Sequence, residues 1–458
     1  MKTVFISSFH QFISRNILHT PILEGLLRVQ DLRVVIIVPA DKKDYFEKEF
    51  NRPGLTIESI RTSRTANGFW SFFFKRLARA ASDVRYRFLI RGYEKHQSTL
   101  RNRFVDIFFY SPAQFLARFR FIRTLMRFLD YHLVKNARVA DLFKKYSPSV
   151  VFSTDVQNES DVLLMIEARR RGTRIIAMFR SWDNIETQGL LRVIPDALLV
   201  WGEYLRNEIL RLDDIQPDNV KIVGVPHYDR YVKGPTMSRE RFFSSIGADP
   251  ARRLILFTPV GDMYLKENDA DGLVLSELSR LDANILVRMP PADTVSFGDF
   301  VPPSNVFFYQ PGKGAMRTGR RELSPEDDDH LINSLYFSDL VICGPSTIML
   351  DAAVIGRPVL LFGFEKRQKI YEESLLSQYD LRYLKVVIDN GAAILARNIS
   401  DFNAAITEYL LDPQKDAVRQ KMVVEMLCFK ADGKSSERVL DVLKKSLYAG
   451  NASEKPTR

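Results

Sequence analysis

The sequence is poor in cysteine and has no long hydrophobic run. Its 458 residues include only Cys343 and Cys428, which excludes a disulfide scaffold and fits a protein of a reducing cytoplasm. No grouping of Cys and His has the spacing of a zinc site, so no metal ligand set is predicted. Apolar runs such as Val34–Val38 fall far short of the ~20 residues that span a bilayer, and the N-terminus does not resemble a signal peptide.

Several catalytic signatures are also missing. The sequence has no Gly-x-Ser-x-Gly and no His-Glu-x-x-His, and Gly433-Lys434-Ser435 lacks the upstream glycine of a P-loop. The acidic run 327–329 could hold Mg²⁺ on a nucleotide, but its charged neighbours favour a solvated turn. We therefore expect chemistry that needs neither a metal nor a resident cofactor.

Positive charge is concentrated in one block. The formal net charge of the chain is +10, yet residues 61–145 alone hold 19 Lys/Arg and 5 Asp/Glu. Such a block indicates an anionic partner: phospholipid head groups, a phosphorylated carrier or nucleic acid. Phe115, Phe119, Ile122 and Met126 recur at helical spacing with arginines between them, which favours an interfacial helix on anionic lipid. Helices packed on the domain with solvated arginines are the alternative, and no nucleic-acid-binding motif is present.

Strand-like and helix-like segments alternate along most of the chain. Continuous apolar strands in such an alternation predict parallel sheets covered by helices on both faces, an α/β fold. Residues 61–145 contain no clear strand and are predicted to form a helical insertion, whereas Lys385–Ile388 is expected to be a strand. The expected organisation is two doubly wound, Rossmann-like domains facing a cleft: residues 1–226, a polar linker at 227–250, residues 251–448, and a tail at 449–458.

The second half carries the strongest motif. A buried-type strand over 340–343 is followed by a Gly344-Pro345 turn, and Ser346 or Thr347 is expected to cap the next helix. A helix N-terminus with free N–H groups and hydroxyls is an anion site, although an ordinary cap reads the same way. Asp351, one turn later, could accept from a ribose hydroxyl or complement the helix dipole. Other candidate donor contacts in this half are Thr258, Arg288 and His330.

Candidate acceptor residues lie in the first half. Trp182, Asp183 and Asn184 follow a predicted strand, and residues at the carboxyl ends of strands line the cleft of such folds. Asp183 could act as general base on an acceptor hydroxyl and Trp182 could stack on a sugar ring, while a turn with local hydrogen bonds is the alternative. Asp155, at the end of the preceding strand, is the competing base. The loop after the first strand adds His10, Arg15 and Asn16.

These motifs carry a family resemblance. The segment 344–364 resembles the Ser-Ser-Thr…Gly-x-Pro-Val donor element of GT-B glycosyltransferases, which bind the nucleotide donor in the second of two Rossmann-like domains. Gly224-Val-Pro-His-Tyr-Asp and Ala431-Asp-Gly-Lys-Ser-Ser-Glu-Arg-Val resemble elements of bacterial surface-polysaccharide transferases related to the CDP-glycerol glycerophosphotransferases. The family histidines are absent, because Trp182-Asp183-Asn184 stands for Trp-His-Gly and Arg288-Met289-Pro290 for Arg-x-His-Pro.

The resemblance implies a glycosyltransferase of cell-surface polysaccharide synthesis, working in the cytoplasm at the inner face of the cell membrane. It would move a sugar from a nucleotide sugar to a glycan or lipid-linked acceptor. The missing histidines favour sugar transfer, with a CDP-activated glycerol or ribitol phosphate transferase as the alternative. A nucleotide-sugar epimerase of the same architecture and a non-catalytic relative are also open. No nucleic acid partner is expected, and the only nucleotide is the donor itself.

Overall fold

The computed structural model describes residues 1–62, 67–81, 111–212, 214–263, 265, 267–291, 293–312 and 322–448. The expected tail at 449–458 and the middle of the expected insertion, 82–110, lie outside these residues. Contacts divide the described chain into two compact units. Unit 1 runs to His227 and resumes at Lys434, and unit 2 is Tyr228–Gly433. The segment expected as a linker contains most of the 3-10 helix η6 (Pro226–Lys233) and all of α13 (Arg239–Ile246).

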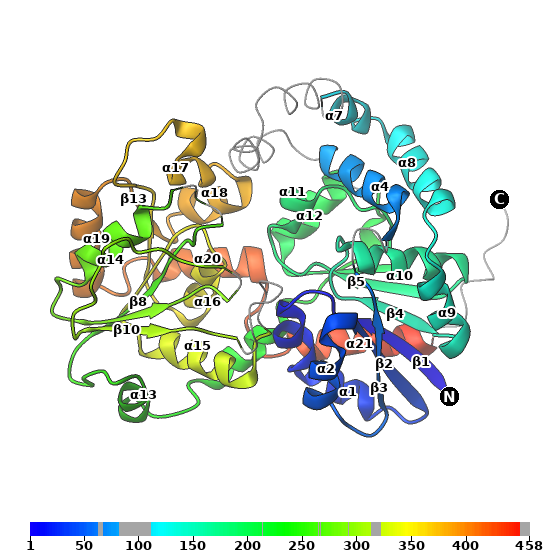
Figure 1. Ribbon diagram of the computed structural model, residues 1–458, viewed down its shortest axis with the longest axis horizontal. Helices are drawn as coiled ribbons and strands as arrows, with labels where there is room; N and C mark the ends of the chain where they lie inside the picture. The colour runs from blue at the N-terminus through cyan, green and yellow to red at the C-terminus, as the bar shows by residue number, and fades with distance from the viewer. Residues whose placement is uncertain are drawn as a thin grey trace. The chain divides into compact units, whose positions relative to one another are not determined.

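Unit 1 is built on a seven-stranded parallel sheet with the order β3-β2-β1-β4-β5-β6-β7 (Figure 1). Its central strands are apolar on both faces and fully buried, as Val34–Val38 illustrates, because helices cover both sides of the sheet. The strands are β1 (Lys2–Ser7), β2 (Leu32–Pro39), β3 (Leu55–Ile60), β4 (Val150–Ser153), β5 (Arg174–Met178), β6 (Ala197–Val200) and β7 (Val220–Ile222).

Helices complete unit 1. They include the π-helical turn η1 (Ser14–Leu18), α1 (Pro21–Leu27), α2 (Lys43–Glu49), α9 (Ala137–Tyr146), α10 (Glu159–Arg170), α11 (Asn184–Gln188) and α12 (Glu203–Leu212). The last helix, α21 (Ser435–Tyr448), packs against α1 in this unit, although the sequence grouped it with the second half. The chain therefore returns to its first unit after completing the second.

The described part of residues 61–145 is helical, as predicted. It contains α4 (Phe69–Ala80), α7 (Ser111–Ala117) and α8 (Arg120–Leu133), which contact one another along one side of unit 1 (Figure 1). Gly189 allows the backbone of unit 1 to approach α4 closely. Its φ is +89°, and a Cβ at this position would lie 2.3 Å from the carbonyl oxygen of Ala78. Leu190 N–H donates to the same carbonyl at 3.2 Å.

Unit 2 has a six-stranded parallel sheet with the order β10-β9-β8-β11-β12-β13, the Rossmann order. The strands are β8 (Leu254–Thr258), β9 (Asn284–Arg288), β10 (Val306–Tyr309), β11 (Leu340–Cys343), β12 (Val359–Phe362) and β13 (Ile394–Ala396). The remaining helices are α14 (Ala270–Leu278), α15 (Pro325–Phe337), α16 (Ile348–Ile355), α17 (Leu375–Gln378), α18 (Arg382–Asp389), α19 (Ile399–Leu411) and α20 (Ala417–Cys428). The prediction of an α/β protein with two Rossmann-like domains is confirmed.

One expected strand is wrong. Lys385–Ile388 lies inside α18, and the sixth strand of this sheet is β13. The run Val386-Val387-Ile388 has high β propensity, but Leu384 and Val387 are spaced to bury one face of a helix. Tertiary packing of that face overrides the local preference.

Candidate functional site

The sheet order of unit 2 reverses between β8 and β11, and ligands of doubly wound folds bind beside such a reversal, at the carboxyl ends of the strands. The loops that follow these two strands touch each other. Gly344 comes directly after β11, and a Cβ at this position would lie 2.4 Å from Cγ2 of Val260. Buried Asp271 holds the other loop, because its carboxylate accepts from the backbone N–H groups of Val260 and Gly261 at 2.9 and 3.0 Å.

Arg288 and His330 meet at this edge of the sheet. Arg288 ends β9, and its Nη1 lies 3.1 Å from Nδ1 of His330 on α15, while its Nη2 donates to the carbonyl of Asp327 at 3.0 Å. The ring of His330 stacks on Tyr309, with centroids 3.4 Å apart. Tyr309 in turn donates to Asp327 Oδ1 at 2.8 Å. The structure thus brings together two residues that the sequence placed 42 positions apart.

The contacts of His330 determine its protonation. Burial lowers its pKa to about 3, and the nearby charge of Arg288 acts in the same direction. A guanidinium can only donate, so Nδ1 accepts and the single proton of the neutral ring sits on Nε2. Within the described chain, His330 Nε2 has no hydrogen-bond partner, and neither has Oγ1 of Thr258, which is 8% exposed. Two buried donors are thus unpaired at the strand ends.

The hydroxyls after β11 do not cap α16 as expected. Thr347 is in the N-cap position but has helical backbone angles and makes no side-chain capping bond. A capping side chain needs an extended backbone at that position to reach the N–H two or three residues on. Ser346 is exposed and Thr347 is half-buried, so both hydroxyls lie at the surface of the loop that follows the strand.

Asp351 is an internal residue. Its side chain is 3% exposed, and its carboxylate accepts a hydrogen bond from the hydroxyl of Tyr231 at 2.5 Å. Its negative charge also contributes to raising the pKa of buried Cys343 and Cys428, for which burial is the larger cause. The expected contact between Asp351 and a ribose does not fit this position, because the carboxylate faces the protein interior.

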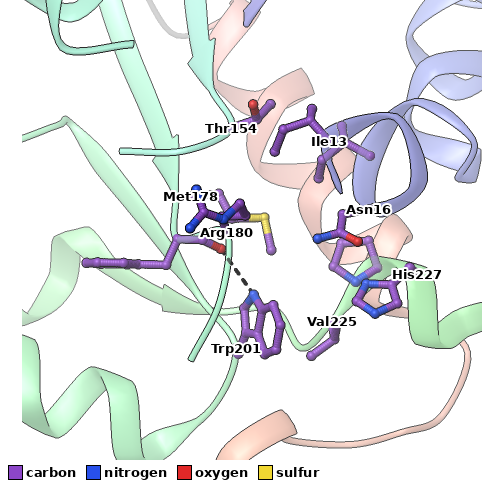
Figure 2. A pocket seen from close by; sticks show the side chains of 11 residues that line it. Ile13, Asn16, Thr154, Met178, Arg180, Trp201, Val225 and His227 are labelled. Carbon is purple, nitrogen blue, oxygen red and sulfur yellow. Dashed lines mark hydrogen bonds between the residues drawn. The ribbon is translucent and has the colours of Figure 1, made fainter. Parts of the chain in front are cut away.

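Unit 1 has a pocket at the carboxyl ends of its own strands. Figure 2 shows Asn16, Thr154, Arg180, Trp201 and His227 around it, and these residues follow β1, β4, β5, β6 and β7. Trp201 closes one side and donates through Nε1 to the carbonyl of Phe179 at 3.1 Å. The expectation that Asn16 lies near the strand ends fits this position. Because the pocket is lined wholly by unit 1, its geometry is a property of that unit.

Arg15 brings a positive charge to this region and contacts His227. Arg15 Nη2 lies 3.2 Å from Nε2 of His227, and its Nε donates to Oδ1 of Asn16 at 3.1 Å. Burial first, and then the charge of Arg15, holds the pKa of His227 well below its usual range. His227 is therefore neutral and accepts from Arg15. No role for His227 is predicted from the sequence, although the residue stands in the Gly224–Asp229 motif.

The two candidate bases occupy different environments. Asp155 is 2% exposed and forms an ion pair with Arg180, and its Oδ1 has no hydrogen-bond partner within the described chain. Asp183 is half-buried at the start of α11. A base must reach the hydroxyl that it deprotonates, which the half-buried residue can do with less rearrangement. Arg180, the ion-pair partner of Asp155, is not singled out by any motif in the sequence.

The neighbours of Asp183 are interior residues. Trp182 is 2% exposed and Asn184 is fully buried, so the indole offers little surface for a sugar ring, and the expected stacking stays a prediction. Both amide atoms of Asn184 lack hydrogen-bond partners within the described chain. His10 lies in the loop after β1, half-buried, with its Nδ1 accepting from the backbone N–H of Phe12 at 3.3 Å.

A buried carboxyl group that the sequence did not single out joins the loops after β1 and β4. Asp161 on α10 is fully buried and accepts from the hydroxyls of Ser7 and Ser153, the second at 2.9 Å. Burial, and then the charge of Asp155, raises its pKa to about 8, so it is mainly protonated at neutral pH. Asp161 is a structural support for the strand-end loops of unit 1.

Solved structures share this fold at low sequence identity. The UDP-GlcNAc 2-epimerase from Neisseria meningitidis, bound to UDP-GlcNAc, has a TM-score of 0.55 and 12% identity over 97% of this chain and 100% of that chain. MnaA from S. aureus with UDP has a TM-score of 0.56 and 13% identity over 100% and 99%. The wall teichoic acid polymerase TagF has a TM-score of 0.50 and 12% identity over 97% and 89%. These similarities support the GT-B architecture.

No curated protein matches the sequence. A family model does match, and it spans residues 194–445. This range is more than half of the chain, and it includes Arg288, His330 and the loop after β11. The chain is therefore a GT-B-type transferase that belongs to the CDP-glycerol:poly(glycerophosphate) glycerophosphotransferase family.

Proposed function

We propose that unit 2 binds the diphosphate of a nucleotide-linked donor at the ends of β8, β9 and β11. The observation that carries this proposal is the pair of unpaired buried donors, His330 Nε2–H and Thr258 Oγ1–H. His330 contacts Arg288 through its other ring nitrogen, and Thr258 ends β8, the strand that pairs with β9 and so lies beside Arg288 in the sheet. Buried polar groups are almost always hydrogen-bonded. Two unpaired buried donors in this part of unit 2 therefore favour binding of a ligand with many acceptor atoms. A diphosphate supplies acceptor oxygens and negative charge.

These residues would act on the leaving group. Arg288 is held in place by the carbonyl of Asp327 and by His330, so its charge is already oriented when the nucleotide departs. Fixed donors that need no rearrangement stabilise developing negative charge most effectively. Because the pKa of His330 is about 3, the ring contributes a neutral hydrogen bond, and Arg288 contributes the charge. Ser346 and Thr347 are further candidate donor contacts, since their hydroxyls lie at the surface of the adjacent loop.

For the group transferred, we propose a sugar. Asp183 stands where the resembling family elements carry a histidine, and in this proposal it takes the proton of an acceptor hydroxyl, with Arg15 and Asn16 as acceptor contacts. The acceptor is a glycan or a lipid-linked cell-envelope polymer. The family match favours a second candidate, transfer of glycerol or ribitol phosphate from a CDP-activated donor. Both reactions release a nucleotide from the same site.

A product assay separates the two. The chain is incubated with UDP-, GDP- or CDP-activated donors and cell-envelope acceptors, with and without EDTA, and the released nucleotide and the extended acceptor are identified by mass spectrometry. Sugar transfer releases a nucleoside diphosphate and adds a sugar mass. Polyol phosphate transfer releases CMP and adds a phosphate-containing mass. Asp183→Asn is expected to reduce turnover at least 100-fold, with Asp412→Asn on the surface as control. An unchanged rate would remove Asp183 as the base.

A further inference from the structure

Unit 1 has a second pocket, which is lined by α4, by the loop that follows β4 and by the end of α11. Its polar lining residues are Lys75, Arg79, Gln157, Gln188 and Arg192, and the others are apolar and nearly fully buried. α4 is a helix of 12 residues, and no helix in the described part of the chain is both long and apolar enough to cross a membrane. All the lining residues precede position 194, where the family match begins. The pocket is therefore a feature of this chain outside the matched range.

The charge of Arg192 is compensated within the protein. Its guanidinium donates to the two oxygens of Asp130 at 2.7 and 2.8 Å and to both oxygens of Glu159 at 2.9 Å. Two carboxylates around one guanidinium leave a single negative charge. Lys75 and Arg79 of α4 bring two positive charges to the same pocket, so these groups together keep a net positive charge.

Lys75 has no partner within the described chain. Its ammonium group makes no hydrogen bond or ion pair there, and the two acids that attract it, Glu159 and Asp155, are already bound to arginines. Burial, and then the charge of Arg79, lowers the pKa of Lys75. A lysine side chain is seldom withdrawn from water without a compensating anion. An anionic ligand would supply the partner that Lys75 lacks.

The two glutamines of the pocket present opposite ends of their amides. Arg79 Nη2 donates to Oε1 of Gln188 at 2.6 Å, so the other end of that amide is an N–H donor. Gln157 donates through Nε2 to the carbonyl of Gly189, and its buried Oε1 has no hydrogen-bond partner within the described chain. The pocket thus combines cations and N–H donors with one unpaired acceptor. A ligand that matches this set carries negatively charged oxygens and one O–H group.

We propose that this pocket binds a phosphate group that retains one proton. Lys75 and Arg79 compensate its charge, and the amide N–H of Gln188 donates to its oxygens. Its P–O–H group donates to Oε1 of Gln157. Sulfate has the same tetrahedral shape but no proton at neutral pH, so it would leave that buried acceptor unpaired. The free ion and a phosphate monoester share this chemistry.

Calorimetric titration with inorganic phosphate at pH 8 tests the site. Lys75→Met should bind phosphate at least about tenfold more weakly than the wild type, because it removes a charge-assisted contact, and Lys75→Arg should keep most of the affinity. Arg76→Gln is the matched control, since it removes the neighbouring cation of α4, which does not line the pocket. In His330→Phe the Lys75-dependent binding should persist, because the inference does not rest on the donor site of unit 2.

Thermal unfolding separates a binding role of Lys75 from a structural one. Without phosphate, Lys75→Met should melt at or above the melting temperature of the wild type, because it removes a charge that has no partner. With phosphate, the wild type and Arg76→Gln should be stabilised, and Lys75→Met should not. A lower melting temperature of Lys75→Met in phosphate-free buffer would show that Lys75 supports the fold instead, and would overturn the proposal.

Sulfate and a monoester complete the test. At pH 8 the wild type should bind phosphate at least about tenfold more tightly than sulfate, and Gln157→Met should lose this preference. Methyl phosphate is titrated at pH 6, where about half of a monoester keeps its proton. Tighter binding than inorganic phosphate identifies an ester as the source, and weaker binding identifies the free ion. No phosphate binding, equal phosphate affinity of the wild type and Lys75→Met, or equal wild-type affinity for phosphate and sulfate would contradict the proposal.

Discussion

The substitution Arg192→Met is expected to destabilise unit 1 strongly, because Arg192 neutralises two carboxylates that water hardly reaches. Its side chain is 4% exposed and forms a bidentate contact with Asp130, 1% exposed, and a second contact with Glu159, 12% exposed. Removing one partner of such a buried network leaves uncompensated charge and costs about 3–5 kcal/mol. For a unit of this size, that corresponds to a melting temperature lower by roughly 6–20 °C.

The experiment uses urea and thermal unfolding followed by circular dichroism. Arg280→Met is the matched control, since Arg280 pairs with Glu277 while 70% exposed, and its loss should change the unfolding free energy by less than about 0.5 kcal/mol. Asp130→Leu/Arg192→Met should recover part of the stability, because it removes the more deeply buried carboxylate together with its partner and leaves only Glu159 without its arginine. A loss below about 1 kcal/mol in Arg192→Met would refute the assignment of this network as the anchor of α8.

Further predictions concern pH and two close contacts. The hydrogen bonds from Arg123, and from Arg127, lower the pKa of Asp214 to about 2. The stabilisation, about 2 kcal/mol, is therefore present above the unfolded pKa near 4 and is lost as the pH falls towards 2. Acid unfolding of Arg123→Gln/Arg127→Gln should lack that step, whereas Arg118→Gln should keep it. The pKa of Asp161 is raised to about 8. The contribution of its protonated carboxyl to folding stability is therefore fully present below the unfolded pKa and is lost as the pH rises through 8. Asp161→Asn should raise the melting temperature more at pH 8 than at pH 5, and an equal change in melting temperature at both pH values would contradict the assignment. Gly189→Ala should cost more than about 2 kcal/mol, because a Cβ would meet the Ala78 carbonyl at a positive φ. Gly234→Ala also has a positive φ but meets no atom within 4 Å, so it is the control without a collision and should cost less.

The sequence was informative about strands and about the residues that end them. Buried β-branched runs predicted the two parallel sheets. The rule that ligands bind at the carboxyl ends of parallel strands singled out Arg288 and His330, which contact each other in the structure. The sequence did not predict whether Arg123 and Arg127 face the protein or the solvent, because an amphipathic pattern does not show which face of the helix packs against the rest of the protein. Their partner Asp214 lies 87 residues beyond Arg127.

Burial explains the other differences. Asp351 and Trp182 follow the strand-end rule in sequence, yet both are nearly fully buried, because the residues after a strand turn inward as well as outward. His227 accepts a hydrogen bond from Arg15, which lies 212 positions away in the sequence. No local sequence pattern predicts such a pair. Ser346 and Thr347 looked like a cap from their residue types, whereas capping depends on backbone angles that residue type does not fix.

The central claim is that the strand ends of unit 2 bind the diphosphate of a nucleotide, and calorimetric titration of the wild type and His330→Phe tests it directly. UDP, GDP, CDP and ADP are titrated at pH 7, with His132→Phe, an exposed histidine of unit 1, as the matched control. Phenylalanine keeps the stacking on Tyr309 but removes both the Nε2–H donor and the Nδ1 acceptor that contacts Arg288. Losing a hydrogen bond to a charged ligand costs about 1.5–3 kcal/mol. The account predicts that one nucleotide binds the wild type and the control equally, and binds His330→Phe at least tenfold more weakly. Equal affinity for all three proteins, or no binding of any nucleotide to the wild type, would contradict it.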